Sequence, residues 1–322
     1  MPSGLVTIAK KEFSETLRSK RFFIVIILFV ALWAFISAST SIVRGMSRSI
    51  GGMGFFGGVG SDLASAMMFV APILGIALGY TAISGEREVG SLKLMLARPI
   101  HREDVITGKA LAGIAAAGVA MFASTLIAAG GGVWLQGVTL TLDGVTRLLT
   151  FTLLSVMLFA AYYTICLFFS TLFTKTSRSL LVAIFIWVLF SFIIPVAASL
   201  IASVTIGSPP VRPFEPGTTQ PGMNATQPGQ PGMSEDLREY MRSVAEISGS
   251  IQRLSINTHY STVANAVLVA ERQIGGGPGA SMATVTIAEA LTTNWTSLAV
   301  LVAFTAVFFV LSYLAFTRRE ER

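Results

Sequence analysis

Residues 180–206 read LLVAIFIWVLFSFIIPVAASLIASVTI, without a single acidic or basic side chain. A helix of about 20 predominantly apolar residues crosses the hydrocarbon core of a bilayer, whereas strands are much shorter. The sequence therefore predicts an all-α integral membrane protein with six transmembrane helices. Five further runs are long enough and contain no Asp, Glu, Lys, Arg or His: 22–43, 63–83, 110–135, 148–173 and 295–316.

The composition agrees with a membrane protein. Of the 322 residues, 53% are hydrophobic and 12% are charged, whereas about 25% of the residues in a soluble domain are charged. The net charge of +6 would suit a nucleic-acid-binding protein, but the basic residues lie at the ends of the apolar runs. We therefore expect the lipid bilayer, and no nucleic acid, as a partner. Cys166 lies inside an apolar run and no Cys/His metal spacing occurs, so neither an intrachain disulfide nor a metal site is expected.

The distribution of Lys and Arg predicts the orientation. With the N-terminus inside, the inner segments hold fifteen Lys and Arg residues, and the two short outer loops hold only Arg44, Arg48 and Arg147. Cytoplasmic loops carry the excess of basic residues. Both termini of this multi-pass cell-membrane protein, including the tail 317–322, should therefore be cytoplasmic.

The first apolar run has a second interpretation, a signal peptide. Lys20 and Arg21 precede it, and Ser37-Ala38-Ser39 resembles a cleavage site. We favour a membrane span because the run exceeds the usual h-region of about 7–15 residues. Cleavage would leave the topology of the remaining chain unchanged.

Residues 1–21 predict an amphipathic helix lying in the cytoplasmic interface. The alternative is a basic tail that only sets topology, which we disfavour because the apolar face is continuous. At about 100° per residue, that face holds Leu5, Val6, Ala9, Phe13 and Leu17, and the opposite face holds Lys11, Ser14, Glu15 and Arg18.

The long outer loop 207–294 has two parts. Residues 207–233 are rich in Pro, Gly, Gln and Thr and predict a disordered external linker. Within it, Asn224 begins an Asn-Ala-Thr sequon and is a candidate glycosylation site. Residues 234–294 predict an external helical insert packed over the outer mouth of the bundle, because apolar and charged residues in 237–254 recur with helical period.

The inner loop 84–109, SGEREVGSLKLMLARPIHREDVITGK, is the most charged stretch of the chain. Residues 85–97 can form a short helix that Pro99 prevents from continuing. Acidic residues contribute little to membrane orientation, so Glu86, Glu88, Glu103 and Asp104 argue against a purely topological role for this loop.

This loop resembles the cytoplasmic loop of ABC transporter type 2 permeases, the membrane subunits of many exporters, including those that accompany copper-enzyme maturation. The resemblance covers about 25 residues and agrees with the arrangement of the spans. Its motif is Gly-Glu-x-x-x-Gly-Ser/Thr-Leu, followed by a Leu-rich turn, a Pro, an Arg and a Gly-Lys pair. These positions are Gly85, Glu86, Gly90, Ser91, Leu92, Pro99, Arg102, Gly108 and Lys109.

The resemblance implies a permease that couples ATP hydrolysis in another polypeptide to the movement of an unidentified substrate. Its partners would be two copies of an ABC-type ATP-binding subunit, which bind ATP and Mg, and a second permease copy, either identical or a close paralogue. The chain lacks the P-loop motif Gly-x-x-x-x-Gly-Lys-Ser/Thr, so we expect neither enzyme activity nor a cofactor in the chain itself. The expected ATPase-coupling residues are Gly85, Glu86, Arg87, Glu88, Gly90, Ser91, Leu92, Arg98, Pro99, Arg102 and Lys109.

Three alternatives stay open. A secondary transporter or channel-like protein without an ATPase partner would usually carry ionisable residues inside its spans, and these spans carry none. An intramembrane enzyme would need a nucleophile and base, or metal ligands, at depth, but His101 and His259 both lie outside the runs. A soft-metal site in the outer loop would draw on Met223, Met233, Met241 and His259.

Two features within spans concern packing and bending. Gly75 and Gly79 form a Gly-x-x-x-Gly pattern that lets another helix approach closely, from the same chain or from a dimer mate. Pro195 should bend the fifth span and is a candidate hinge.

Overall fold

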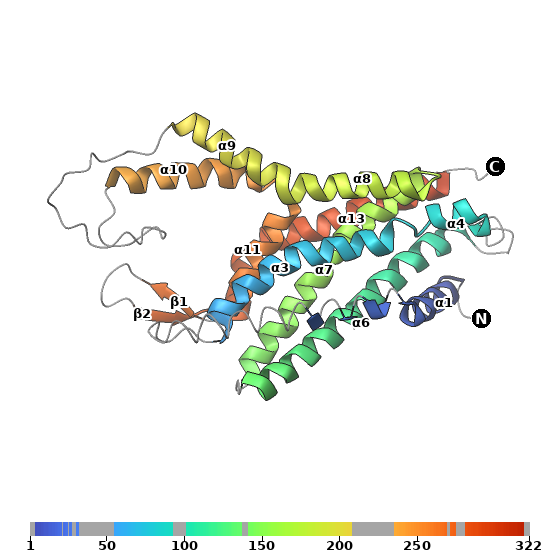
Figure 1. Cartoon of the computed structure of the whole chain (residues 1–322), viewed down its shortest axis with the longest axis horizontal. Coiled ribbons are helices and arrows are strands. Elements are labelled where there is room, and N and C mark those ends of the chain that lie inside the picture. Colours follow the sequence, from blue (N-terminus) through green and yellow to red (C-terminus); the bar gives the residue numbers. More distant parts are fainter. Residues whose placement is uncertain are drawn as a thin grey trace.

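The computed structural model is an elongated helical bundle in which long helices run along the molecule (Figure 1). It describes residues 4–20, 22–24, 26–27, 30–31, 55–92, 101–136, 141–207, 235–268, 271–274 and 281–318. The described part contains five helices that are long and apolar enough to cross a membrane. They correspond to the second to sixth expected spans. The first, 22–43, lies largely outside the described residues, so the count of six stays a prediction.

The spanning helices are continuous over their apolar runs. They are α3 (Phe55–Gly79), α6 (Arg102–Gln136), α7 (Leu142–Leu172), the unbroken succession of α8 (Thr176–Val188), the π-helical turn η1 (Leu189–Ile193) and α9 (Ile194–Ile206), and finally α13 (Trp295–Arg318).

Helix α7 is the centre of the bundle and packs against α3, α6, α8 and α13. Its approach to α3 is closest at two glycines. A Cβ added at Gly75 would lie 3.0 Å from Cβ of Tyr162, and one at Gly79 would lie 2.7 Å from Cβ of Cys166. The helix that approaches the Gly-x-x-x-Gly pattern is therefore α7 of the same chain.

The N-terminal helix α1 (Gly4–Arg18) lies along α6. A Cβ at Gly108 of α6 would lie only 2.9 Å from Cγ2 of Ile8, so the two backbones come close together. Ile8 is buried, whereas Val6, expected on the apolar face, is 51% exposed. The other expected residues of that face, Leu5, Ala9, Phe13 and Leu17, are half-buried, so α1 packs on α6 with most of the expected face and with Ile8.

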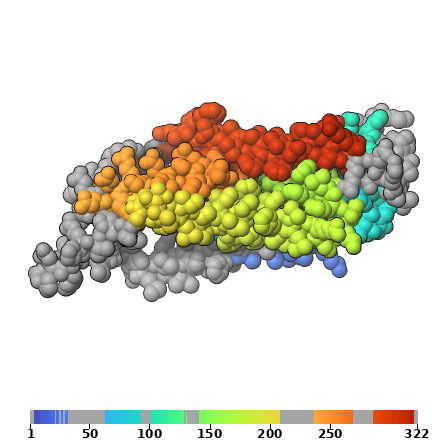
Figure 2. Space-filling model, turned by 90° about the horizontal axis from the view of Figure 1, so that it is seen from above, coloured from blue at the N-terminus to red at the C-terminus, as the bar shows by residue number. Residues whose placement is uncertain are grey.

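At the opposite end of the molecule, α10 (Glu235–Gln252) runs beside α9 (Figures 1 and 2). Helix α11 (Ile256–Leu268) packs between α3, α7 and α13, and its apolar side chains are fully buried. The insert is therefore integrated with the bundle and does more than cover its mouth. It also contains a short antiparallel hairpin of β1 (Glu271–Ile274) and β2 (Ser281–Thr284), which sequence patterns did not indicate, followed by α12 (Ile287–Thr293).

Arg147, at the start of α7, anchors this insert. Its side chain is buried, its Nε donates to Asp143 (2.6 Å), and its Nη1 donates to the carbonyl of Val267 at the end of α11 (2.7 Å). Its Nη2 donates to the carbonyl of Val285, just before α12. Arg147 was expected only as an outer-loop charge, and in the structure it holds α11 and the segment before α12 to α7.

Candidate functional site

The expected coupling loop begins with a short helix, α4 (Ser84–Val89), that follows α3 after a tight turn. Oγ of Ser170 in α7 accepts hydrogen bonds from the backbone N–H groups of Ile83 (3.0 Å) and Ser84 (2.9 Å), which fixes this turn. The helix ends at Gly90, whose φ of 80° lies in the left-handed region that favours glycine. Helix α4 is therefore shorter than the expected 85–97, and residues 93–100 lie outside the described part of the chain.

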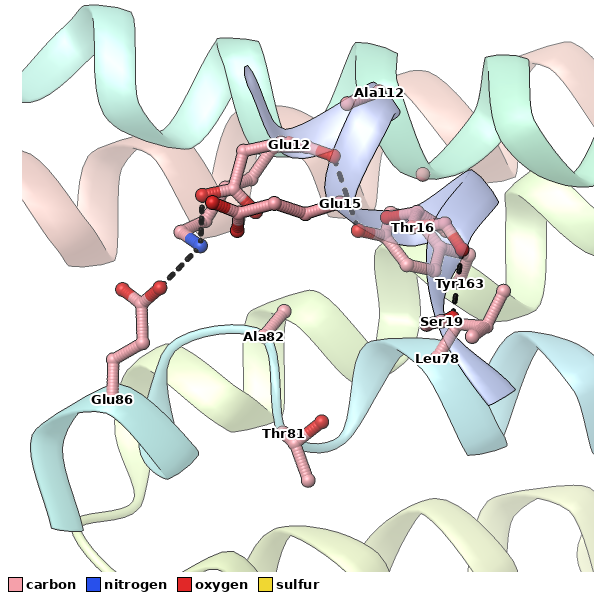
Figure 3. A pocket seen from close by; sticks show the side chains of 12 residues that line it. Glu12, Glu15, Thr16, Ser19, Leu78, Thr81, Ala82, Glu86, Ala112 and Tyr163 are labelled. Carbon is pink, nitrogen blue, oxygen red and sulfur yellow. Dashed lines mark hydrogen bonds and ion pairs between the residues drawn. The ribbon is translucent and has the colours of Figure 1, made fainter. Parts of the chain in front are cut away.

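A buried ion cluster joins α4 to two other helices (Figure 3). Nζ of Lys109 in α6 lies 3.0 Å from Oε1 of Glu12 in α1 and 2.6 Å from Oε1 of Glu86 in α4. The lysine side chain is only 6% exposed, while Glu12 and Glu86 are 17% and 24% exposed. Charge-assisted hydrogen bonds are strong in such low-dielectric surroundings. Lys109 therefore holds α1 and α4 to the same point of α6.

This cluster carries an excess of negative charge. Two carboxylates face one ammonium group, and within the described residues no donor reaches the buried Oε2 of Glu86. The cluster borders a cavity of about 290 Å³ between α1, α3, α4 and α6, which Glu15, Thr81 and Tyr163 also line (Figure 3).

The next two residues fasten α4 to the following pair of spans. Nη1 of Arg87 donates to the carbonyls of Thr171 (3.1 Å) and Phe173 (3.0 Å) at the end of α7. Oε2 of Glu88 accepts hydrogen bonds from the backbone N–H (3.2 Å) and the hydroxyl (2.6 Å) of Thr176, the first residue of α8. Both side chains thus satisfy backbone groups that helix ends leave unpaired, and their charges complement the helix dipoles.

The exposed part of the site is the tip that follows. Val89 is 84% exposed, and Gly90 and Ser91 are also exposed, whereas Leu92 is buried. Arg102 lies at the start of α6 with a half-buried side chain. Arg98 and Pro99 fall among the residues that the structure does not describe.

The structure therefore brings some expected site residues together and leaves others apart. Glu86 and Lys109 meet directly, and Gly85 packs against Thr81. Glu12 and Thr176 were not among the expected site residues. Glu12 could be noticed because this acid lies beside the apolar face of the N-terminal helix, but no sequence pattern paired it with Lys109, 97 positions away.

The other candidate residues give a mixed picture. Among the described residues, no three His, Cys, Asp or Glu side chains gather as a metal site. His259 has both ring nitrogens within hydrogen-bond distance of protein groups, Oγ of Ser297 (3.1 Å) and the carbonyl of Arg253 (2.8 Å). Met223, Met233 and the glycosylation candidate Asn224 lie outside the described residues. Pro195 is in the first turn of α9, directly after η1.

Comparison with known proteins agrees with this architecture. Residues 6–321 match the family model described as ABC-2 family transporter protein. A probable ABC transporter permease protein NosY of Pseudomonas aeruginosa is 33% identical over 107 residues, which is 33% of this chain and 37% of that protein. The protein of the same name from Stutzerimonas stutzeri is 34% identical over 107 residues, 32% of this chain and 36% of its own length. The alignments thus span little more than a third of these relatives. Because the family model covers nearly the whole chain, the protein belongs to the ABC-2 transporter family.

Proposed function

We propose that this chain is the membrane-spanning permease subunit of an ABC exporter, driven by ATP hydrolysis in a separate subunit that docks at α4. Membrane subunits of this family are generally not enzymes. The relatives named above are described as probable permeases, which is consistent with this assignment.

The observation that carries the proposal is the fastening of α4 on three sides. Glu86 ties it to Lys109, Arg87 ties it to the end of α7, and Glu88 ties it to the start of α8. A helix of six residues held at three points moves with the spans to which it is fastened. Force applied at its tip would therefore reach α6, α7 and α8 together.

In this proposal the charged residues of α4 position the lever rather than dock the partner. Their side chains are engaged within the chain, so the docking surface is the exposed tip around Val89 and Ser91. A small, reversible contact of this kind suits a partner that changes shape with each ATP cycle.

The assembly would contain two permease copies and two ATP-binding subunits that hold ATP and Mg. Helices α8, α9 and α13 bury few of their side chains within the single chain, which leaves faces for lipid and for a second copy. The absence of ionisable residues from the expected spans favours a lipid-like or amphipathic cargo over a hydrophilic ion.

A photo-crosslinking amino acid at Val89 tests the docking site in native membranes. The matched control is Leu142, which is 85% exposed at the other end of the bundle, against 84% for Val89. We expect the Val89 probe, and not the Leu142 probe, to capture a nucleotide-binding protein.

The proposal also predicts that ATP affects this contact. ATP with Mg should change the yield of the Val89 adduct, because the partner closes on nucleotide. The proposal fails if Val89 captures no nucleotide-binding protein while the purified permease alone moves cargo down an ion gradient, which would instead support a secondary transporter.

A further inference from the structure

The fifth expected span is interrupted by a π-helical turn. In η1 the backbone N–H of Ile194 donates to the carbonyl of Leu189, five residues back rather than four. The next residue, Pro195, has no N–H to donate. The Phe190 carbonyl therefore receives no hydrogen bond from Ile194, its donor in an α-helix, or from Pro195, its donor in a π-helix.

A side chain from a distant part of the chain supplies the missing donor. Oγ of Ser255, in the turn between α10 and α11, donates to the carbonyl of Phe190 at 2.9 Å. Ser255 is fully buried, where an unpaired carbonyl would cost about 1–3 kcal/mol. The Ser255 hydroxyl thus stabilises the π-helical hydrogen-bonding register at this point.

Asn257 adds a second connection at the same place. Its Nδ2 donates to Oγ of Ser191 in η1 (2.9 Å), and its Oδ1 accepts a hydrogen bond from the hydroxyl of Tyr162 in α7 (2.9 Å). Its own backbone N–H donates to Oγ of Ser255 (3.3 Å). We call Ser255 and Asn257 the clasp. It joins the π turn to α7, the most buried helix of the bundle.

Loss of the clasp would allow a different register to compete. In an ordinary α register the N–H of Ile194 would bond to the Phe190 carbonyl, and Pro195 would leave the carbonyl of Ser191 unpaired instead. Each register thus lacks one backbone donor, and the Ser255 hydroxyl compensates for that loss only in the π register. A change to the α register removes one residue from the turn, and at 3.6 residues per turn it rotates everything beyond it by about 100°. Interruptions of this kind recur at functional sites and hinges.

The segment beyond the turn is an outer arm, which we define as α9 with α10. The two helices pack along one another, and the hydroxyl of Tyr240 in α10 donates to the carbonyl of Gly207 at the end of α9 (3.2 Å). Space-filling atoms of α9 and α10 lie together at one end of the molecule in Figure 2. Rotation of α9 would therefore displace α10 as well.

We propose that Ser255 and Asn257 are positioning residues that select the π register of the fifth span and so set the orientation of the outer arm. The register selection is a property of the chain alone. Its use to open and close the outer end during transport rests on the proposed function.

Electron spin-resonance distances in the full-length chain, purified in lipid nanodiscs, test the selection. With Cys166→Ala removing the native thiol, spin labels would be placed at Val204 on α9 and Leu142 at the start of α7, which are 83% and 85% exposed. A helix is about 10–12 Å wide, so a rotation of 100° moves the label on α9 by about 8 Å. We expect Ser255→Ala to shift the distance distribution, or to split it into two populations.

The effect of Ser255→Ala should also be measured in a chain that carries Pro195→Ala. Alanine restores a backbone N–H that can bond to Phe190 in the π register, so Ser255→Ala should have little further effect there. Ser250→Ala is the matched control, because the Ser250 hydroxyl bonds only within α10, to the Glu246 carbonyl (2.8 Å), and is exposed. It should leave the distance unchanged.

Two results would overturn the inference: an unshifted distance in Ser255→Ala, or an equal shift with and without Pro195→Ala. If Ser255→Ala does not fold, Ser191→Ala removes the contacts of its hydroxyl with Asn257 and Tyr162 and should populate the second distance partially. A wild-type distribution in that variant counts against the clasp. The measurement needs no ATPase. A shifted distance, together with a failed Val89 cross-link and transport by the purified permease alone, would therefore retain the clasp and reject the proposed function.

Discussion

Replacing Lys109 with methionine keeps most of the side-chain volume and removes the charge that holds α1 and α4 to α6. The variant leaves Glu12 and Glu86 facing each other without a cation, although their side chains are largely buried. Removing one partner of a buried ion pair costs about 3–5 kcal/mol. Because both carboxylates retain some exposure, we take about 2–4 kcal/mol, which corresponds to a fall of about 5–10 °C in Tm.

Thermal unfolding of the purified permease in detergent, followed by intrinsic fluorescence, measures this loss. The matched control is Lys11→Met, because Lys11 pairs with Glu15 at 3.5 Å on an open surface where the two side chains are 57% and 61% exposed. An exposed pair of this type contributes at most about 0.5 kcal/mol. Lys11→Met should therefore leave Tm nearly unchanged.

A triple variant separates lost pairing from lost packing. Combining Lys109→Met with Glu12→Gln and Glu86→Gln removes all three charges, and replacing a whole buried ion cluster with neutral groups is often nearly neutral. We expect it to recover most of the lost stability while ATPase stimulation in the assembled transporter stays low, because α4 is no longer tied to α6. Equal Tm values for Lys109→Met and Lys11→Met, or no recovery in the triple variant, would refute the reasoning.

Two further predictions concern packing. Gly79→Leu should push α3 from α7, because even a Cβ there meets Cβ of Cys166 at 2.7 Å, and we expect thermal unfolding to show a loss of about 1–3 kcal/mol in stability. The control is Gly249→Leu, where a Cβ has open space, and it should be neutral or slightly stabilising. Similar losses in both variants would contradict the packing account. Arg147→Met should loosen the outer insert, because the carbonyls of Val267 and Val285 lose their donor, and the rate of amide hydrogen exchange in α11 should rise at least tenfold. The control is Arg242→Met on the exposed face of α10, which should leave this rate unchanged. An unaltered exchange rate in Arg147→Met would exclude the anchoring role.

The membrane class and most spans could be predicted because both depend on local properties of the chain. The run 180–206 has no charged side chain over a length that exceeds a bilayer crossing, and no tertiary contact can make such a segment water-soluble. The charged loop 84–109 stood out for the same reason, since acids there have no role in setting topology. The limits of α4 were harder to predict, because the helix ends at Gly90, well before the proline that sequence patterns favoured as its terminator.

Only the tertiary structure decided what the charged residues do. Glu86, Arg87 and Glu88 were predicted as coupling residues, and the structure adds that each bonds to a different helix of the same chain. Lys109 pairs with Glu12, which is 97 positions away in the sequence, and Ser255 donates to the carbonyl of Phe190, which is 65 positions away. A sequence by itself shows which segments must avoid water, because that depends on composition over about 20 residues. The pairing of hydrogen-bond donors with acceptors depends on how the helices pack together, and no local sequence pattern predicts that pairing.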